Sequence, residues 1–160
     1  MAANTVNGLS PSPSQGSPTQ ESLLSFESTT DKMKQIFSKY LDPYLQNTLC
    51  ANVFKLIGGN DFKKSCFAYA NAKDNYLVSE LQQLPVKDRE FNYMQYDSAY
   101  LELRSYLKPL STALADPEKA IDRMSFLQRV SLRAAYAALS GQIDKIGQSA
   151  TELVLQISRL

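Results

Sequence analysis

A long apolar seam near the carboxyl end is the feature that most constrains how this chain folds. From Leu132 to Leu160, apolar residues recur at alternating spacings of four and three positions. This is a heptad repeat, which predicts a helix that packs against another helix along a left-handed, knobs-into-holes seam. The seam consists of Leu132, Tyr136, Leu139, Ile143, Ile146, Ala150, Leu153, Ile157 and Leu160.

The flanking residues leave two alternatives for what covers this seam. An exposed two-stranded coiled coil usually carries charges at its e and g positions. Here those positions are small or uncharged, which is typical of a helix packed among several others in a bundle. Either the seam is core of the chain's own bundle, or part of it binds a second copy or another protein. The seam residues proposed for such a surface are Ile143, Ile146, Leu153, Ile157 and Leu160.

The helix that carries the seam has a strong start signal. Asp116 is a good N-cap, Pro117 suits the first helical position, and Glu118 adds a negative charge to the first turn. Because no proline follows, we expect one long helix to near Leu160, about 66 Å long at 1.5 Å per residue. Two shorter helices that meet at Gly141 are the alternative, since glycine weakens a helix.

Helical periodicity also dominates the chain upstream, and no run of β-branched and aromatic residues alternates with period two. The sequence therefore predicts an all-α fold, a helical bundle of about five helices over residues 29–160. Four upstream helices are expected. The first runs from a cap at 28–30 to 41, and the second from 42–43 to the glycines 58–59. The third runs from a cap at 60 or 61 to 84, with a bend or break near 71–75, and the fourth from 86 to 108, where Pro109 ends or kinks it.

A polar tail precedes the predicted bundle. Over residues 1–28, eighteen residues are Ser, Thr, Pro, Gln, Asn or Gly, and the only charges are Glu21 and Glu27. Such a segment buries too little apolar surface to offset the entropy of ordering it, so we expect disorder. This composition also resembles the N-termini of proteins exported by bacterial type III secretion, which implies an export signal in the tail.

Composition argues against several function classes. Seventeen basic and sixteen acidic residues give a net charge of +1, which is too small for the basic footprint of a nucleic-acid binder. The chain has no histidine, which excludes Ser-His and Cys-His catalysis and His-containing zinc sites. Without a cofactor motif or a long apolar run, we expect no enzyme, no cofactor, no metal, no small-molecule substrate and no membrane span.

The two cysteines bear on the compartment. Cys50 and Cys66 are sixteen residues apart, among apolar positions, and so are not a CxxC redox pair. We expect them to be reduced and buried, which favours a reducing cytoplasm. A disulfide between them is the alternative and would indicate an oxidising compartment.

A tyrosine stripe is the other candidate binding feature. Tyr93, Tyr96 and Tyr100 recur at i, i+3 and i+7 on one side of the fourth predicted helix, whereas Phe91, Met94 and Leu101 lie on another side. Tyrosine is common both in half-buried core positions and in protein interfaces. We therefore expect a non-catalytic helical module, an adaptor, chaperone-like or assembly component. It would bind a partner through the seam or the stripe. An exported bacterial effector or secretion-apparatus component is the alternative.

Overall fold

The computed structural model describes residues 26–56, 58–115, 125–139 and 142–160. Every regular element in these ranges is a helix, which confirms the all-α prediction. The predicted tail, residues 1–28, lies outside the described residues up to position 25, as do the helix start at Asp116 and the proposed joint at Gly141. No helix in the described ranges is both long and apolar enough to cross a membrane.

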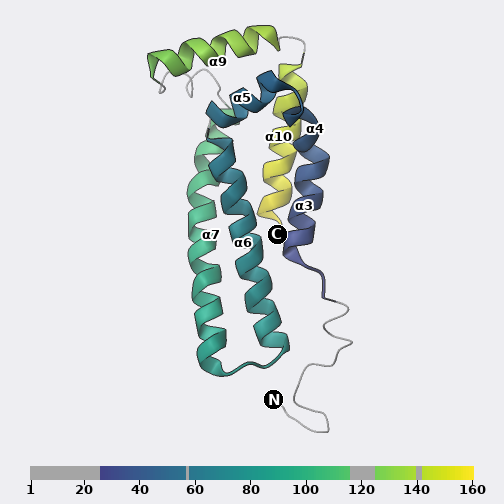
Figure 1. The fold of residues 1–160 in the computed structure, drawn as a ribbon, viewed down its shortest axis with the longest axis vertical. Coiled ribbons are helices and arrows are strands. Elements are labelled where there is room, and N and C mark those ends of the chain that lie inside the picture. The colour runs from purple at the N-terminus through teal and green to yellow at the C-terminus, as the bar shows by residue number, and fades with distance from the viewer. Residues whose placement is uncertain (1–25, 57, 116–124, 140–141) are drawn as a thin grey trace.

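Four helices form the bundle, each in contact with the next around a ring: α3 with α6, α6 with α7, α7 with α10, and α10 with α3 (Figure 1). They are α3 (Thr29–Tyr40), α6 (Gly59–Leu81), α7 (Val86–Ala115) and α10 (Ile143–Ser158). Their inward faces share one apolar core, which contains Met33, Phe37, Leu41, Phe62, Cys66, Tyr69, Ala70, Leu103, Leu153 and Ile157.

The start of α3 is fixed by a cap and by a neighbouring helix. Ser28 is the N-cap, and its side-chain oxygen accepts a hydrogen bond from the backbone N–H of Asp31. The carboxylate of Asp74 on α6 accepts three more, from the Ser28 hydroxyl at 2.7 Å and the N–H groups of Thr29 at 2.6 Å and Thr30 at 2.9 Å. Free N–H groups at a helix start need such acceptors, so α3 is capped from within the bundle.

The prediction of one helix from residue 42 to the glycines at 58–59 is wrong. The structure has a single turn, α4 (Asp42–Leu45), and then α5 (Thr48–Leu56). The side-chain oxygen of Asn47 accepts hydrogen bonds from the N–H groups of Leu49 and Cys50, at 2.9 and 3.3 Å. An asparagine that bonds to the next turn in this way favours a new helix start over continuation.

The helices α6 and α7 form a long antiparallel hairpin (Figure 1). Gly58, in the left-handed region at φ 81°, precedes α6, so the helix begins at Gly59, before the expected cap at Asn60 or Asp61. It then continues without a break to Leu81. The short connection is held by Arg89, which donates to the Leu84 carbonyl and pairs with Glu80 at 3.2 Å.

Pro109 does not end α7, contrary to the prediction of a helix from Val86 to Lys108. The helix continues to Ala115 with the proline inside it. Proline removes one backbone donor, normally bonded to the carbonyl four residues earlier, here Ser105. Both residues are exposed, so water can satisfy that carbonyl at little cost.

The prediction of one continuous helix to Leu160 is also wrong, because two separate helices carry the seam. The meeting point that the alternative placed at Gly141 lies outside the described residues. A first helix, α9 (Phe126–Ala138), packs across α5 at one end of the bundle, and α10 runs back between α3 and α7 (Figure 1). The physical reason is burial. The bend lets the two parts of the seam bury against different neighbours, Leu132 and Leu139 where α9 crosses α5, and Leu153 and Ile157 in the core between α3 and α7.

Candidate functional site

Five tyrosines from α6 and α7 form one aromatic cluster. Tyr76 stacks on Tyr96 with ring centroids 5.7 Å apart and meets Tyr93 edge-on at 5.3 Å. Tyr69 lies 5.8 Å from Tyr96 and 6.1 Å from Tyr100. The sequence stripe therefore supplies three members. The two from α6 were not predicted as members, although their spacing could have identified them: Tyr69 and Tyr76 are seven residues apart and so share a helix face.

Burial decreases along this cluster. Tyr69 is only 5% exposed in the core, whereas Tyr100 is 42% and Tyr93 is 50% exposed. Burial, and next the neighbouring Tyr96 and Tyr100, raise the pKa of Tyr69 above its usual range, and burial also raises that of Tyr76. Both phenols stay protonated at neutral pH and can donate hydrogen bonds.

Tyr76 and Tyr93 line a groove of α6 and α7 residues alone, where the hairpin continues past the ends of α3 and α10. The start of α3 is bonded to Asp74, and Lys73 donates to the carbonyl of Leu160 beyond the end of α10. Beyond these residues α6 and α7 project as a two-helix arm (Figure 1). In a four-helix bundle this inner face would be covered, but none of the helices that the structure describes covers it on the arm.

One side of α7 carries an apolar line along this boundary. Val86, Tyr93, Tyr100 and Leu107 are each seven residues apart, which places them on one helix face. We call this line the α7 flank. Its spacing is the heptad interval at which a helix accepts a parallel or antiparallel neighbour.

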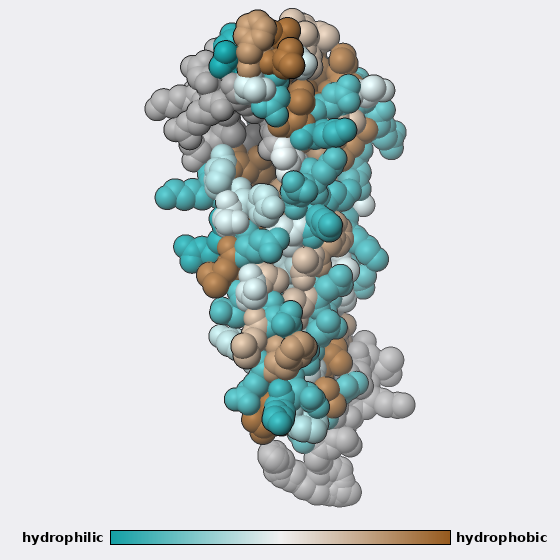
Figure 2. Space-filling view, turned by 60° about the vertical axis from the view of Figure 1, so that its left-hand side comes forward, coloured by the Kyte–Doolittle hydropathy of each residue, from teal (hydrophilic) through white to brown (hydrophobic). Residues whose placement is uncertain are grey.

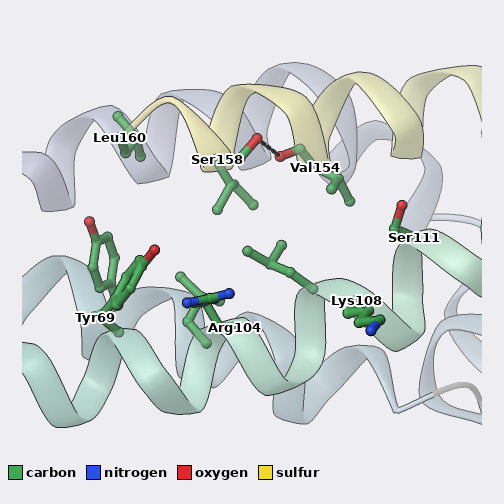
Figure 3. Close-up of a pocket in the computed structure, with 11 residues that line it drawn as sticks. Tyr69, Arg104, Lys108, Ser111, Val154, Ser158 and Leu160 are labelled. Carbon is green, nitrogen blue, oxygen red and sulfur yellow. Dashed lines mark hydrogen bonds between the residues drawn. The ribbon is translucent and has the colours of Figure 1, made fainter.

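The upper part of the α7 flank faces α10 across a cleft of about 440 Å³ (Figure 3). Tyr69, Arg104 and Lys108 lie on the α6 and α7 sides, and Val154, Ser158 and Leu160 lie across from them. The lower part, beyond α10, lines a second groove of about 410 Å³. That groove is formed by Tyr76, Glu80, Val86, Arg89, Glu90, Tyr93 and Met94.

The outer side of α7 is uncovered as well. Phe91 is 61% exposed, Met94 is 66% exposed and Leu101 is 56% exposed. Figure 2, which brings this side of the molecule forward, shows apolar side chains interspersed among polar ones along the arm. Within the described structure, no other helix covers these three side chains.

The seam residues lie mostly inside the bundle. Leu153 and Ile157 are 2% exposed in the main core, and Leu160 packs against that core. Ile146 is half-buried, and Ile143 begins α10. The chain's own helices thus cover Leu153 and Ile157, as the first alternative for the seam required. Among the residues predicted for binding, Tyr93 and Tyr100 are far more exposed than Leu153 and Ile157.

The structure also places the two cysteines. Cys50 and Cys66 are both free and buried, as expected for reduced thiols. Burial raises the pKa of Cys66 to about 12, which keeps it protonated and unreactive. Among the residues that the structure describes, no three Cys, Asp or Glu side chains are grouped closely enough to hold a metal ion.

Comparison with known proteins adds no family. No family model, curated protein or solved structure matches this chain. Its function must therefore be argued from its own surface.

Proposed function

We propose that this chain is a non-catalytic helical module that binds a helix of a partner protein along the lower α7 flank. The observation that carries the proposal is the open end of the four-helix bundle. There the tyrosine cluster continues past the last residue of α10 onto the two-helix arm. A partner helix would take up the line that α10 leaves and complete the bundle.

The dimensions and chemistry of the flank support this proposal. From Val86 to Tyr100, where the flank reaches the cleft beside the end of α10, it is about 21 Å long at 1.5 Å per residue, or about four turns of a partner helix. Helices bind in such grooves through anchor residues at i, i+3, i+4 and i+7. Tyrosines at 50% and 42% exposure supply apolar contact area and keep a hydroxyl for hydrogen bonding.

The test is site-specific photocrosslinking from inside the flank in cells that express the full chain. A photoreactive side chain is placed at Glu90 or at Asp97, which are exposed next to Tyr93, or as a control at Ser38 on α3. We expect one discrete protein adduct from Glu90 and Asp97, and none from Ser38. Tyr93→Asp should remove it, because it puts a charge in the apolar groove.

Two outcomes bear directly on the proposal. An adduct of twice the chain's mass would identify the partner as a second copy of this protein. Absence of adducts at Glu90 and Asp97, or equal adducts from Ser38, would contradict a specific surface on the flank. The circular-dichroism spectrum of Tyr93→Asp should match that of the wild type, since this side chain is half exposed.

A further inference from the structure

The helix α9 is apolar on two opposite sides. One side is buried through Leu132, Ala135 and Leu139, where the helix crosses α5. These three positions follow the spacing of three and four residues that defines one helix face. That face holds α9 to the bundle, and the opposite side takes no part in this contact.

The opposite side of α9 is apolar and in water. With 100° between successive residues, Phe126, Val130, Ala134 and Ala137 project away from the face that meets α5, and Leu127 lies beside them. Phe126 is 69% exposed, Leu127 is 77% exposed and Val130 is 51% exposed. Because α9 lies across the end of the molecule, this side forms the end surface, where apolar side chains gather (Figures 1 and 2).

The charges on α9 are all positive. Its residues Phe126–Ala138 include Arg129 and Arg133 but neither aspartate nor glutamate. On the helix wheel both arginines fall on one edge of the outward apolar side. A helix with Phe and Leu on one side and Arg at its border is the type that lies in the interface of a bilayer, with its apolar side at the acyl boundary.

We infer that the outward side of α9 binds an anionic lipid surface. The helix, about 20 Å long at 1.5 Å per residue, lies flat on the headgroups while the bundle extends away from the membrane. Phe126, Leu127 and Val130 enter the interface, and the positive charge of Arg129 and Arg133 at its edge attracts the anionic headgroups. A second copy is the less suitable occupant, because pairing two such helices brings arginines toward arginines, which costs free energy. The inference is independent of the partner surface on the α7 flank.

The test is co-sedimentation of the full chain with two kinds of vesicle, pure phosphatidylcholine and phosphatidylcholine with about one-third phosphatidylglycerol. We expect binding to the anionic vesicles, weakened by added salt. Phe126→Ser and Leu127→Ser should each lower the partition coefficient about tenfold, since each removes a large apolar group from the interface. Arg133→Gln should lower it about fivefold, the effect of one cation near an anionic surface.

The matched controls are Phe91→Ser and Leu101→Ser, which remove similarly exposed apolar residues from α7. They should leave vesicle binding unchanged. Because Phe126 and Leu127 are exposed, their replacement should also leave the helical content unchanged. Equal losses from the α7 variants, or equal binding to neutral vesicles, would overturn the inference. The inference would also be overturned if light scattering without vesicles showed a dimer and Leu127→Ser converted that dimer to a monomer.

Discussion

At the scale of single residues, Asp74 is a polar side chain that holds two helices together. It joins two helices by accepting hydrogen bonds from the first turn of α3. Burial alone would raise its pKa, but the bonds from Thr30, Ser28 and Thr29 outweigh it, so the pKa of Asp74 lies below its usual range. Hydrogen bonds to the charged form of a carboxyl have this effect.

We predict that Asp74→Ala lowers the free energy of unfolding by about 1–3 kcal/mol at pH 7, because it leaves N–H groups at the start of α3 without an acceptor.

The contribution of Asp74 should also depend on pH. A carboxyl group whose pKa is lower in the folded state than in the unfolded state stabilises the fold at pH values above its unfolded pKa. It loses that contribution as the pH falls through its folded pKa. Asp74→Asn should therefore approach the wild type in stability as the pH falls through the lowered pKa of Asp74. Urea unfolding followed by circular dichroism at several pH values measures both effects.

The exposed Asp97 provides the control for this prediction. Asp97→Asn should change stability by less than about 0.5 kcal/mol and should leave its pH dependence as in the wild type. A stability loss for Asp97→Asn as large as that for Asp74→Ala would show that net charge, and not the bonds to α3, accounts for the result.

Cys66 supports a second prediction at this scale. It is fully buried, and burial raises its pKa to about 12. We expect the Cys66 thiol of a Cys50→Ser variant to react with a thiol-specific disulfide reagent only as fast as the protein unfolds, since the thiolate is the reactive form. Absorbance of the released reagent gives the rate. Reaction that is fast in native buffer and no faster in urea would contradict it.

At the scale of elements, α10 allows the two alternatives for the seam to be separated. Ile157 is 2% exposed and Leu155, two residues earlier, is 43% exposed. Ile157→Ala should lower the free energy of unfolding by about 2–5 kcal/mol, because it leaves a cavity in the core. Leu155→Ala should cost much less. Neither should change the molecular mass in light scattering. A loss of mass with unchanged stability in Ile157→Ala would instead make this residue part of an interface between chains.

Helix content was predictable from the sequence because the apolar spacing is helical along most of the chain. Helix ends were less predictable where a local signal competes with packing. Asn47 starts a new helix by bonding ahead, and Pro109 stays within α7 because its surroundings are exposed. The spacing of the seam from Leu132 to Leu160 is regular, but two helices carry it. α9 buries its part against α5, and α10 buries its part against α3 and α7. Spacing along one chain does not carry that information.

The candidate binding surface was predictable only in part. Spacing alone placed Tyr93, Tyr96 and Tyr100 on one side of a helix. Their meeting with Tyr69 and Tyr76 depends on the register of the α6–α7 hairpin, and their exposure depends on where α10 ends. Both are properties of tertiary packing. The outward side of α9 was hidden for the same reason, since an apolar residue can be recognised as uncovered only once its neighbours are known.

At the scale of the whole molecule, we predict that stability is graded along its long axis. Amides of α6 near Cys66 lie within four packed helices, whereas those near Tyr76 lie in the two-helix arm. Regions with fewer apolar contacts open at lower free energy. In hydrogen–deuterium exchange, peptides from Tyr76 to Leu81 should exchange about tenfold or more faster than those from Ser65 to Ala70. Equal protection would mean that something covers the arm.

The length of α7 sets the distance between the two ends of the molecule. This one continuous helix of 30 residues runs from the tip of the arm to the end of the bundle beneath α9 (Figure 1), a distance of about 45 Å at 1.5 Å per residue. Any ligand held at the tip and any surface touched by α9 are therefore kept apart by a rigid spacer. Inserting or deleting whole turns of the hairpin would change that standoff in steps of about 5.4 Å.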